Sequence, residues 1–174
     1  FEIMPLAGLF LGFHYYGLFV AAVISVALAG IVLALAWWRA RYVAPFPMFS
    51  LVLSAGFTAA AVLFDAAIFI KIQPTIFNGL FAAVLLGGLL IGRAMMQVFF
   101  AKQFFLTDET WYRLSCRWGW FFLCLAIANE LVWRNASDAD WVFFKTFIAA
   151  PASVLFMLAQ LPLTIRGRIK SDNL

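Results

Sequence analysis

The sequence has few of the charged residues that a water-soluble surface requires. Only 11% of its 174 residues are charged, whereas 66% are apolar and 18% are aromatic. Soluble domains carry about 25% charged and about 45–50% apolar residues. This deficit excludes a chain that lies mainly in water. It predicts an all-α integral membrane protein, with residues 1–174 forming a single polytopic bundle of transmembrane helices.

Histidine and cysteine are also scarce, which limits the chemistry. His14 is the only histidine, so a His-based metal site or a Ser-His triad lacks its partners. Cys116 and Cys124 are separated by about 12 Å along one predicted helix, too far for a disulfide. The sequence has no Cys-x-x-Cys, Walker loop, dinucleotide glycine fingerprint or paired-acid constellation. We therefore expect no enzyme activity, no metal and no cofactor.

Uncharged apolar runs predict five membrane spans, because an ionised side chain at the bilayer centre costs several kcal/mol. The expected spans cover residues 17–38, 46–64, 74–91, 114–133 and 144–165. Pro45 and Pro47 separate the first two spans, and Pro74 suits the first turn of the third. The fourth is expected to begin as a charged stem after an N-cap at Thr107, and the fifth follows a capping box at Ser137.

A short apolar stretch at residues 3–13 precedes the first span. At about 1.5 Å per residue it covers only about 17 Å, whereas the hydrocarbon core is about 30 Å thick. We therefore predict a re-entrant or interfacial half-helix. The stretch has no basic n-region and no small-residue cleavage site, so it is not expected to be a signal peptide, although the chain begins at Phe1 and not at Met.

The basic residues predict the orientation. Nine of the twelve Lys and Arg residues fall between spans one and two, between spans three and four, or in the tail 166–174. These nine are Arg39, Arg41, Arg93, Lys102, Arg113, Arg117, Arg166, Arg168 and Lys170. The positive-inside rule places this side, and the C-terminus, in the cytoplasm. Because these residues flank apolar runs, they indicate topology and not nucleic-acid binding.

Lys71 and Lys145 belong to the opposite side, each near the start of a helix. The helix dipole disfavours a cation there by roughly a few tenths of a kcal/mol, so another interaction must favour it. One hypothesis is that the two lysines bind the phosphate head groups of outer-leaflet lipids. The alternative is that the lysines snorkel, with Asp65 and Asp140 as their local partners.

Glu130 is a carboxylate near the end of a predicted span, which makes it a candidate functional residue by default. Arg134 follows it at a spacing of four residues. On a helix this spacing brings the two charges together. An interfacial ion pair is therefore the simpler expectation.

Small residues recur at four-residue spacing, as Gly8 with Gly12 and Gly88 with Gly92. This spacing is typical of helices that pack closely in membranes. The glycines are therefore candidate helix-packing positions, which either pack within the chain or contact another membrane protein.

Four stretches resemble the intracellular septation protein A family of the bacterial inner membrane. They cover residues 69–76 (FIKIQPTI), 110–114 (TWYRL) with Trp118, 125–130 (LAIANE) and 141–145 (WVFFK), in the order and spacing of that family. The resemblance implies a small multi-pass inner-membrane protein that supports envelope biogenesis, membrane integrity and cell division without enzymatic activity. Its implied partners are membrane lipids and inner-membrane proteins of the elongation and division machinery.

Two other functions stay open. A transporter or lipid-handling protein would use Lys71 and Lys145, but such a protein needs polar residues along a path through the membrane. The candidates for that path are few: Ser25, Ser54, Thr58, Asn78, Ser153 and Gln160. An accessory subunit of a larger membrane complex would instead dock through its glycine faces and apolar perimeter.

Overall fold

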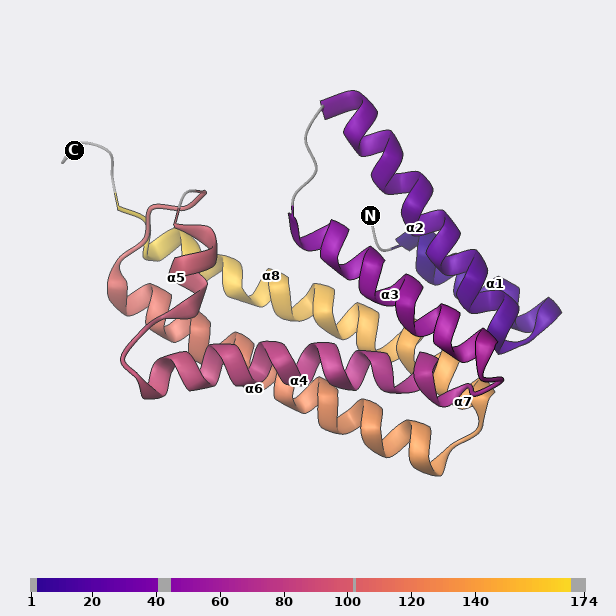
Figure 1. Ribbon diagram of the computed structural model, residues 1–174. Coiled ribbons are helices and arrows are strands. Elements are labelled where there is room, and N and C mark those ends of the chain that lie inside the picture. The colour runs from indigo at the N-terminus through magenta and orange to yellow at the C-terminus, as the bar shows by residue number, and fades with distance from the viewer. Residues whose placement is uncertain (1–2, 41–44, 102, 170–174) are drawn as a thin grey trace. The chain divides into compact units, whose positions relative to one another are not determined.

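The computed structural model describes residues 3–40, 45–101 and 103–169. Regular structure in these residues is helical, apart from one isolated antiparallel bridge between Leu106 and Arg168. The elements in chain order are α1 (Ile3–Tyr16), α2 (Leu18–Ala40), α3 (Pro45–Leu63), α4 (Ile68–Leu90), α5 (Met95–Phe100), α6 (Asp108–Asn135), α7 (Asp138–Phe143), the π-helix η1 (Phe144–Ala149) and α8 (Ala150–Arg166) (Figure 1). The predicted all-α class is confirmed. Arg41, Lys102 and Lys170, which entered the charge count, lie outside the described residues.

Three helical segments are long and apolar enough to cross a membrane. They are Leu18–Arg39, Ile68–Leu90 and Asp138–Arg166, and they correspond to the predicted first, third and fifth spans. The described apolar part of α3, Ser50–Leu63, is shorter. α6 has 28 residues but is more polar, because both of its ends carry charged side chains. By length and composition, the structure therefore supports three of the five predicted spans.

The position of Pro74 departs from the prediction. We expected it in the first turn of a span, but α4 begins at Ile68 and Pro74 lies inside it. The apolar residues before Pro74 extend the helix toward its N-terminus, so the proline removes an N–H that would have bonded to the Ile70 carbonyl. Membrane helices tolerate such a proline where nearby polar groups make up for the lost bond.

The described residues form two compact units, each built from segments that are distant in sequence. One unit comprises Phe1–Gln73 with Asn129–Ile148, and the other comprises Pro74–Ala128 with Ala149–Leu174. The division passes through α4 and α6 and lies at the junction of η1 with α8. Each unit therefore has its own core.

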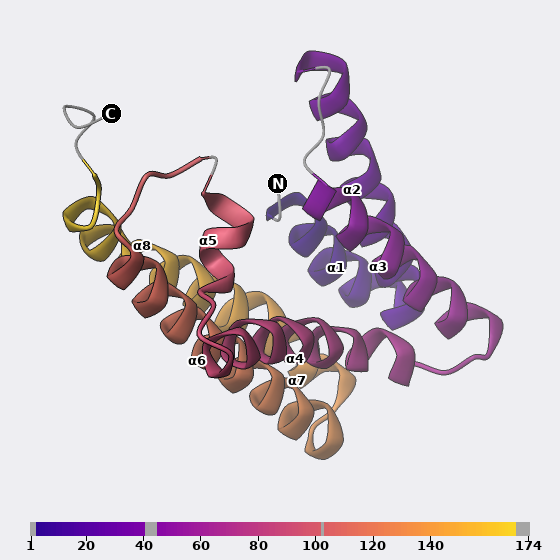
Figure 2. The same cartoon turned by 60° about the vertical axis from the view of Figure 1, so that its left-hand side comes forward.

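The core of the first unit includes a tight hairpin of α1 and α2, which lie side by side in Figures 1 and 2. Gly17 joins the two helices with a φ of 82°, a conformation that glycine adopts without strain. Buried residues of the hairpin pack with residues from α3, α4 and α7. The buried cluster is Leu9, Leu18, Ala21, Ala22, Ala61, Ile70, Trp141 and Val142.

The second unit packs α5 and α8 against α6. Its buried cluster consists of Leu106, Trp111 and Leu114, with Met96, Trp118 and Leu163 packed around it. The rings of Phe121 and Phe156 stack at 4.0 Å between centroids, which joins the middle of α6 to α8. Ser115 Oγ accepts a hydrogen bond of 3.1 Å from the backbone N–H of Met96, which holds α5 against α6.

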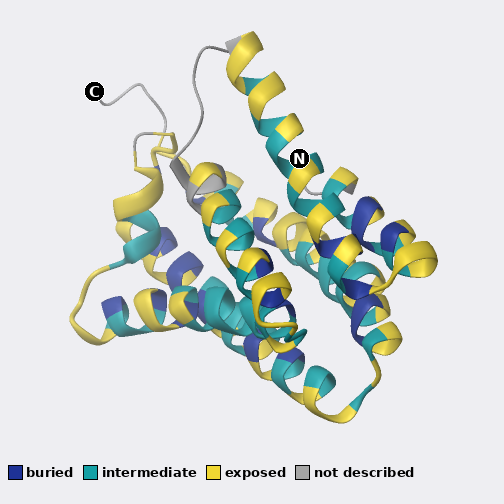
Figure 3. Ribbon diagram, turned by 45° about the vertical axis from the view of Figure 1, so that its right-hand side comes forward, coloured by how far each residue is buried: buried dark blue, intermediate teal, exposed yellow. Residues whose placement is uncertain are grey.

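Much of the helical surface is exposed in both units, as the yellow segments in Figure 3 show. This surface carries large apolar side chains, among them Trp38, Leu63, Leu90, Leu155 and Ile165. In a water-soluble protein such an apolar surface would promote aggregation. In a membrane protein, lipid tails or neighbouring helices cover it.

Candidate functional site

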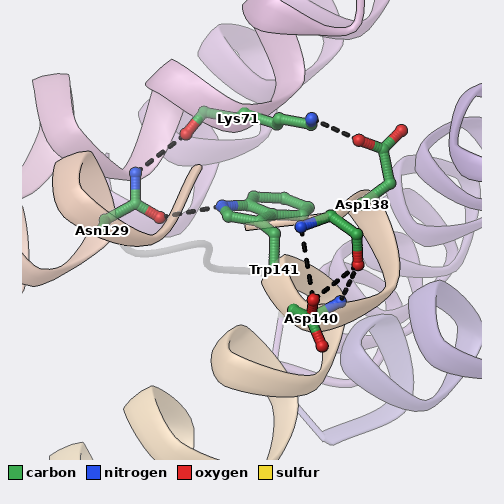
Figure 4. A network of polar contacts seen from close by, with 6 residues as sticks. Lys71, Asn129, Asp138, Asp140 and Trp141 are labelled. Atoms are coloured by element: carbon green, nitrogen blue, oxygen red, sulfur yellow. Dashed lines mark hydrogen bonds and ion pairs between the residues drawn. The ribbon is translucent and has the colours of Figure 1, made fainter. Parts of the chain in front are cut away.

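A buried polar network in the first unit joins three elements: the start of α4, the last turns of α6, and α7 (Figure 4). Asn129 from α6 is 3% exposed and Trp141 from α7 is fully buried. The Trp141 indole N–H donates a hydrogen bond of 3.0 Å to Asn129 Oδ1. Asn129 Nδ2 in turn donates a hydrogen bond of 2.8 Å to the backbone carbonyl of Lys71. One amide side chain therefore links three helical segments.

This contact lies close to the break that Pro74 makes in the hydrogen bonding of α4. The missing N–H of Pro74 leaves the Ile70 carbonyl without its usual helical donor. The next carbonyl along the chain, that of Lys71, is the one that Asn129 bonds. Asn129 thus fastens α4 at the turn that the proline weakens.

The side chain of Lys71 forms an ion pair with Asp138 at the start of α7. The Lys71 side chain is 13% exposed and that of Asp138 is 46% exposed. Burial of the ammonium is therefore offset by a carboxylate that still reaches the surface. Asp138 also lies in the first turn of α7, where the helix dipole favours a negative charge.

The predicted capping box at the start of α7 is confirmed. Ser137 Oγ accepts a hydrogen bond of 3.2 Å from the backbone N–H of Asp140, and the Asp140 carboxylate accepts one of 3.3 Å from the backbone N–H of Ser137. These reciprocal bonds satisfy two of the N–H groups that a helix start leaves unpaired. They set the direction of α7 and so the positions of Asp138 and Trp141.

The predicted lysine partners were wrong. Lys71 pairs with Asp138 and not with Asp65, which occupies an exposed left-handed turn between α3 and α4 with a φ of 47°. Asp140 belongs to the capping box, and the Lys145 ammonium lies 5.1 Å from the centre of the Trp141 ring. Sequence proximity misled here, because tertiary packing brings a carboxylate from another helix to Lys71.

Lys145 lies in η1, directly after α7. A cation over an indole face is attracted by the negative face of the ring. The π-helical turns of η1 widen the helix at this point, and such turns often occur at functional sites. Lys71 and Lys145 therefore meet the same group of residues, Lys71 through Asp138 and Lys145 through Trp141.

Glu130 has the partner that the sequence predicted. Its carboxylate accepts a hydrogen bond of 2.6 Å from Arg134 Nε and another of 2.8 Å from the Trp133 indole. The Arg134 guanidinium also lies 4.6 Å from the centre of the Trp133 ring. The three side chains form one local group at the C-terminal end of α6.

The four candidate packing glycines have different environments. A Cβ atom added at Gly8 would lie 2.4 Å from Leu28 Cδ1, and one added at Gly12 would lie 3.0 Å from the backbone of Ala21. Both glycines face α2. A Cβ at Gly88 would meet the Met95 side chain. Gly92 follows the end of α4 with a φ of 73°, where the turn itself requires glycine, so it does not continue a helix face with Gly88.

Asn129, Asp138 and Trp141 were not singled out as site residues from the sequence. Asn129 is an amide within the otherwise apolar run before Glu130, and this isolation was the available signal. Trp141 appeared only as part of a stretch that resembles a family, and Asp138 only as part of a helix cap. Their association depends on contacts between helices that no local pattern encodes.

Comparison with known proteins shows extensive similarity to one family. The intracellular septation protein A family model matches residues 1–170. The inner membrane-spanning protein YciB of Sinorhizobium medicae is 38% identical over 156 residues, which are 90% of this chain and 74% of that protein. The protein of the same name from Brucella melitensis is 40% identical over 156 residues, with coverage of 90% and 78%. That of Rhizobium meliloti is 39% identical over 157 residues, with coverage of 90% and 72%.

No solved structure matches the chain. The family assignment therefore comes from sequence similarity, and it agrees with the resemblance carried by residues 69–76, 110–114, 125–130 and 141–145. The names of the relatives, together with the apolar helices, identify an inner-membrane protein. The chain belongs to the intracellular septation protein A family.

Proposed function

We propose that this protein is a non-enzymatic helical factor of the inner membrane that supports envelope biogenesis and septation by contacting other membrane proteins. The septation role rests on the name of its family. The contact mechanism rests on one structural observation: several polar side chains within the apolar helices bond within the chain, whereas many large apolar side chains are exposed.

The hydrogen bonds of the polar residues support this reading over a transporter. Ser54 accepts a hydrogen bond from Gln73, and Asn78 donates one of 2.8 Å to the Pro74 carbonyl. Ser153 donates one of 2.8 Å to the Ala149 carbonyl, and Gln160 donates one of 3.1 Å to the Phe156 carbonyl. Four of the six residues that a polar path would use are therefore engaged in local structure.

The proposed topology has five spans, with α3 and α6 as the second and fourth. The charged residues of α6 lie toward its ends, so residues 118–129 form an uncharged middle. Arg117 and Glu130 are separated by about 20 Å along the axis, and arginine side chains extend toward the membrane surface when they flank such a segment. The proposed orientation has a cytoplasmic C-terminus, and the distribution of Lys and Arg supports it.

A site for lipid head groups at Lys71 and Lys145 is the second candidate function. The ion pair with Asp138 already engages the Lys71 ammonium, so this candidate now depends mainly on Lys145. Lys145 contacts an indole ring, and no carboxylate among the described residues pairs with it, so a phosphate group could supply the missing negative charge. Lys145→Gln would then reduce lipid retention, whereas Lys145→Arg would keep it.

Crosslinking in living cells tests the contact mechanism. A photoreactive amino acid replaces Leu155 or Leu158, which are 66% and 48% exposed on α8, and the same amino acid at the buried Leu85 is the matched control. We expect the α8 positions, but not position 85, to form adducts with proteins of the elongation and division machinery. Mass spectrometry identifies the adducts.

A deletion strain tests the septation role itself. Cells that lack the protein are expected to show altered septum spacing and a weakened envelope, and a plasmid copy should restore both. Normal division in the deletion strain, together with adducts to lipid alone, would contradict the proposal.

A further inference from the structure

A cleft with a volume of about 410 Å³ lies in the second unit, between the first turns of α6 and the last turns of α8. Its walls combine charged and hydroxyl groups from α6 with apolar residues from α8. The lining residues are Thr107, Glu109, Thr110, Arg113, Arg117, Ala159, Pro162, Leu163, Arg166 and Gly167. The volume falls within the range of about 300–1,000 Å³ that is typical of small-molecule sites.

The cleft carries an excess of positive charge. Among the described residues that line it, Arg113, Arg117 and Arg166 carry positive charge and Glu109 alone carries negative charge. Arg113 bonds to Glu109 at 2.6 Å. Arg117 Nη1 donates a hydrogen bond of 3.2 Å to Gln160, a neutral side chain that leaves the charge of Arg117 uncompensated.

Backbone contacts hold the two walls of the cleft together. The N–H of Thr107 donates a hydrogen bond of 3.0 Å to the Gly167 carbonyl, and the N–H of Ile169 donates one of 2.9 Å to the Phe105 carbonyl. The close approach requires glycine, because a Cβ atom at position 167 would lie 2.1 Å from Thr110 Oγ1. These backbone contacts hold Arg113 and Arg117 of α6 and Arg166 of α8 around the same cleft.

We propose that this cleft binds the phosphate group of an anionic membrane lipid. Guanidinium groups bind phosphate oxygens through charge-assisted hydrogen bonds, often in pairs. Thr107 and Thr110, whose hydroxyl oxygens lie 2.8 Å apart, line the same cleft and add further polar groups.

The α8 wall favours a lipid over a soluble phosphate compound. Ala159, Pro162 and Leu163 line the cleft, and the exposed side chains of Leu155 and Leu158 lie one helical turn before Ala159 and Pro162. Residues four apart share a helix face, so an apolar strip leads away from the arginines. In a bound lipid, the phosphate head group would contact the arginines and the acyl chains would lie along the apolar strip.

This site differs from the one considered at Lys71 and Lys145, and it does not depend on the septation role. Arg113, Arg117 and Arg166 belong to the basic side of the chain, which the charge distribution assigns to the cytoplasm. The cytoplasmic leaflet carries anionic lipids that attract such residues.

Native mass spectrometry of the full-length protein tests the proposal. The protein is released from mixed micelles that contain phosphatidylglycerol as the anionic probe and phosphatidylcholine as the zwitterionic control. We expect the wild type to retain phosphatidylglycerol preferentially. Arg113→Gln, Arg117→Gln and Arg166→Gln should each weaken this retention about ten- to a hundredfold, as expected for the loss of a charge-assisted hydrogen bond.

Three further variants provide controls. Arg134 matches Arg113, because each pairs with a glutamate four residues earlier and the two side chains are 59% and 58% exposed. Arg134 lies outside the cleft, so Arg134→Gln should leave retention unchanged. Glu109→Gln removes the one acid of the cleft and should increase retention about twofold or more, a gain that misfolding cannot produce. The losses caused by the three arginine variants should be the same in a Lys145→Gln background.

Each alternative outcome would overturn the assignment. Equal retention in the wild type and the three arginine variants would show that the cleft binds no lipid phosphate. Loss with Lys145→Gln alone would move the site to η1. If millimolar inorganic phosphate displaced phosphatidylglycerol completely, or bound with the same dependence on the arginines and no lipid preference, the ligand would be a soluble anion and the lipid assignment would be wrong.

Discussion

The indole N–H of Trp141 donates a hydrogen bond of 3.0 Å to Asn129 Oδ1, and both side chains are buried. The two residues come from α7 and α6, so this bond fixes the rotation of one helix against the other at the hairpin that joins them. Asn129 Nδ2 also donates a hydrogen bond to the backbone carbonyl of Lys71 in α4. A single polar chain therefore holds three helices of the first unit in one arrangement.

Trp141→Phe is expected to lower the free energy of unfolding by about 1–3 kcal/mol. The substitution keeps an aromatic ring but removes the N–H that bonds to buried Asn129 Oδ1. Unfolding of the purified protein in detergent by a denaturing surfactant measures the loss. Trp120→Phe, at a tryptophan that is 57% exposed, is the matched control and should have little effect. An equal loss in both variants would show that the hydrogen bond is unimportant.

The ion pair of Lys71 with Asp138 should be stronger than that of Arg134 with Glu130. Lys71 is 13% exposed, whereas Arg134 is 59% exposed, so solvent screens the first pair less. A double-mutant cycle with Lys71→Met and Asp138→Asn should give a coupling energy of about 1 kcal/mol or more. The cycle with Arg134→Met and Glu130→Gln should give about 0.5 kcal/mol or less. Equal couplings would mean that burial of Lys71 contributes nothing.

Gly12→Ala should destabilise the protein more than Gly8→Ala. The new methyl group at position 12 would meet the backbone of Ala21, which cannot move aside without shifting α2, whereas at position 8 it would meet the end of the Leu28 side chain. We expect a loss of about 1–3 kcal/mol for Gly12→Ala.

Gly56→Ala is the control for this pair, because a Cβ atom at position 56 has no neighbour within 4 Å. It should be neutral or stabilise α3 by up to about 1 kcal/mol, since alanine favours a helix more than glycine does. If Gly12→Ala behaved in the same way, α1 and α2 would not be in the close contact described.

The proposed orientation predicts the behaviour of reporter fusions. A reporter that is active only in the cytoplasm should be active when fused after Leu174 and silent when inserted after Asn135, between α6 and α7. The positive-inside distribution of Lys and Arg is the physical basis. The reverse pattern of activity would refute the orientation, and activity at both positions would refute the five-span topology.

Composition and local pattern determined the fold class. Sparse charge and long apolar runs require backbone hydrogen bonds to be made within each segment, so helices follow without knowledge of any tertiary contact. Local signals also predicted the start of α6 after Thr107, the capping box at Ser137 and the pair of Glu130 with Arg134, because each joins residues within one turn of the chain. Four short stretches were sufficient for the family resemblance.

Only the tertiary structure decided which polar residues meet. Lys71 pairs with Asp138 and not with the predicted partner Asp65, because folding of the chain brings the start of α7 beside the start of α4. The helix around Pro74 begins earlier than its sequence predicts, and Asn129 supports it from a distant position in the chain. The arginines that the sequence presented as topology signals line one cleft because backbone bonds at Thr107 and Gly167 join α6 to α8. These partners are distant in sequence and meet only through the packing of the helices, so neighbouring residues in the sequence cannot predict them.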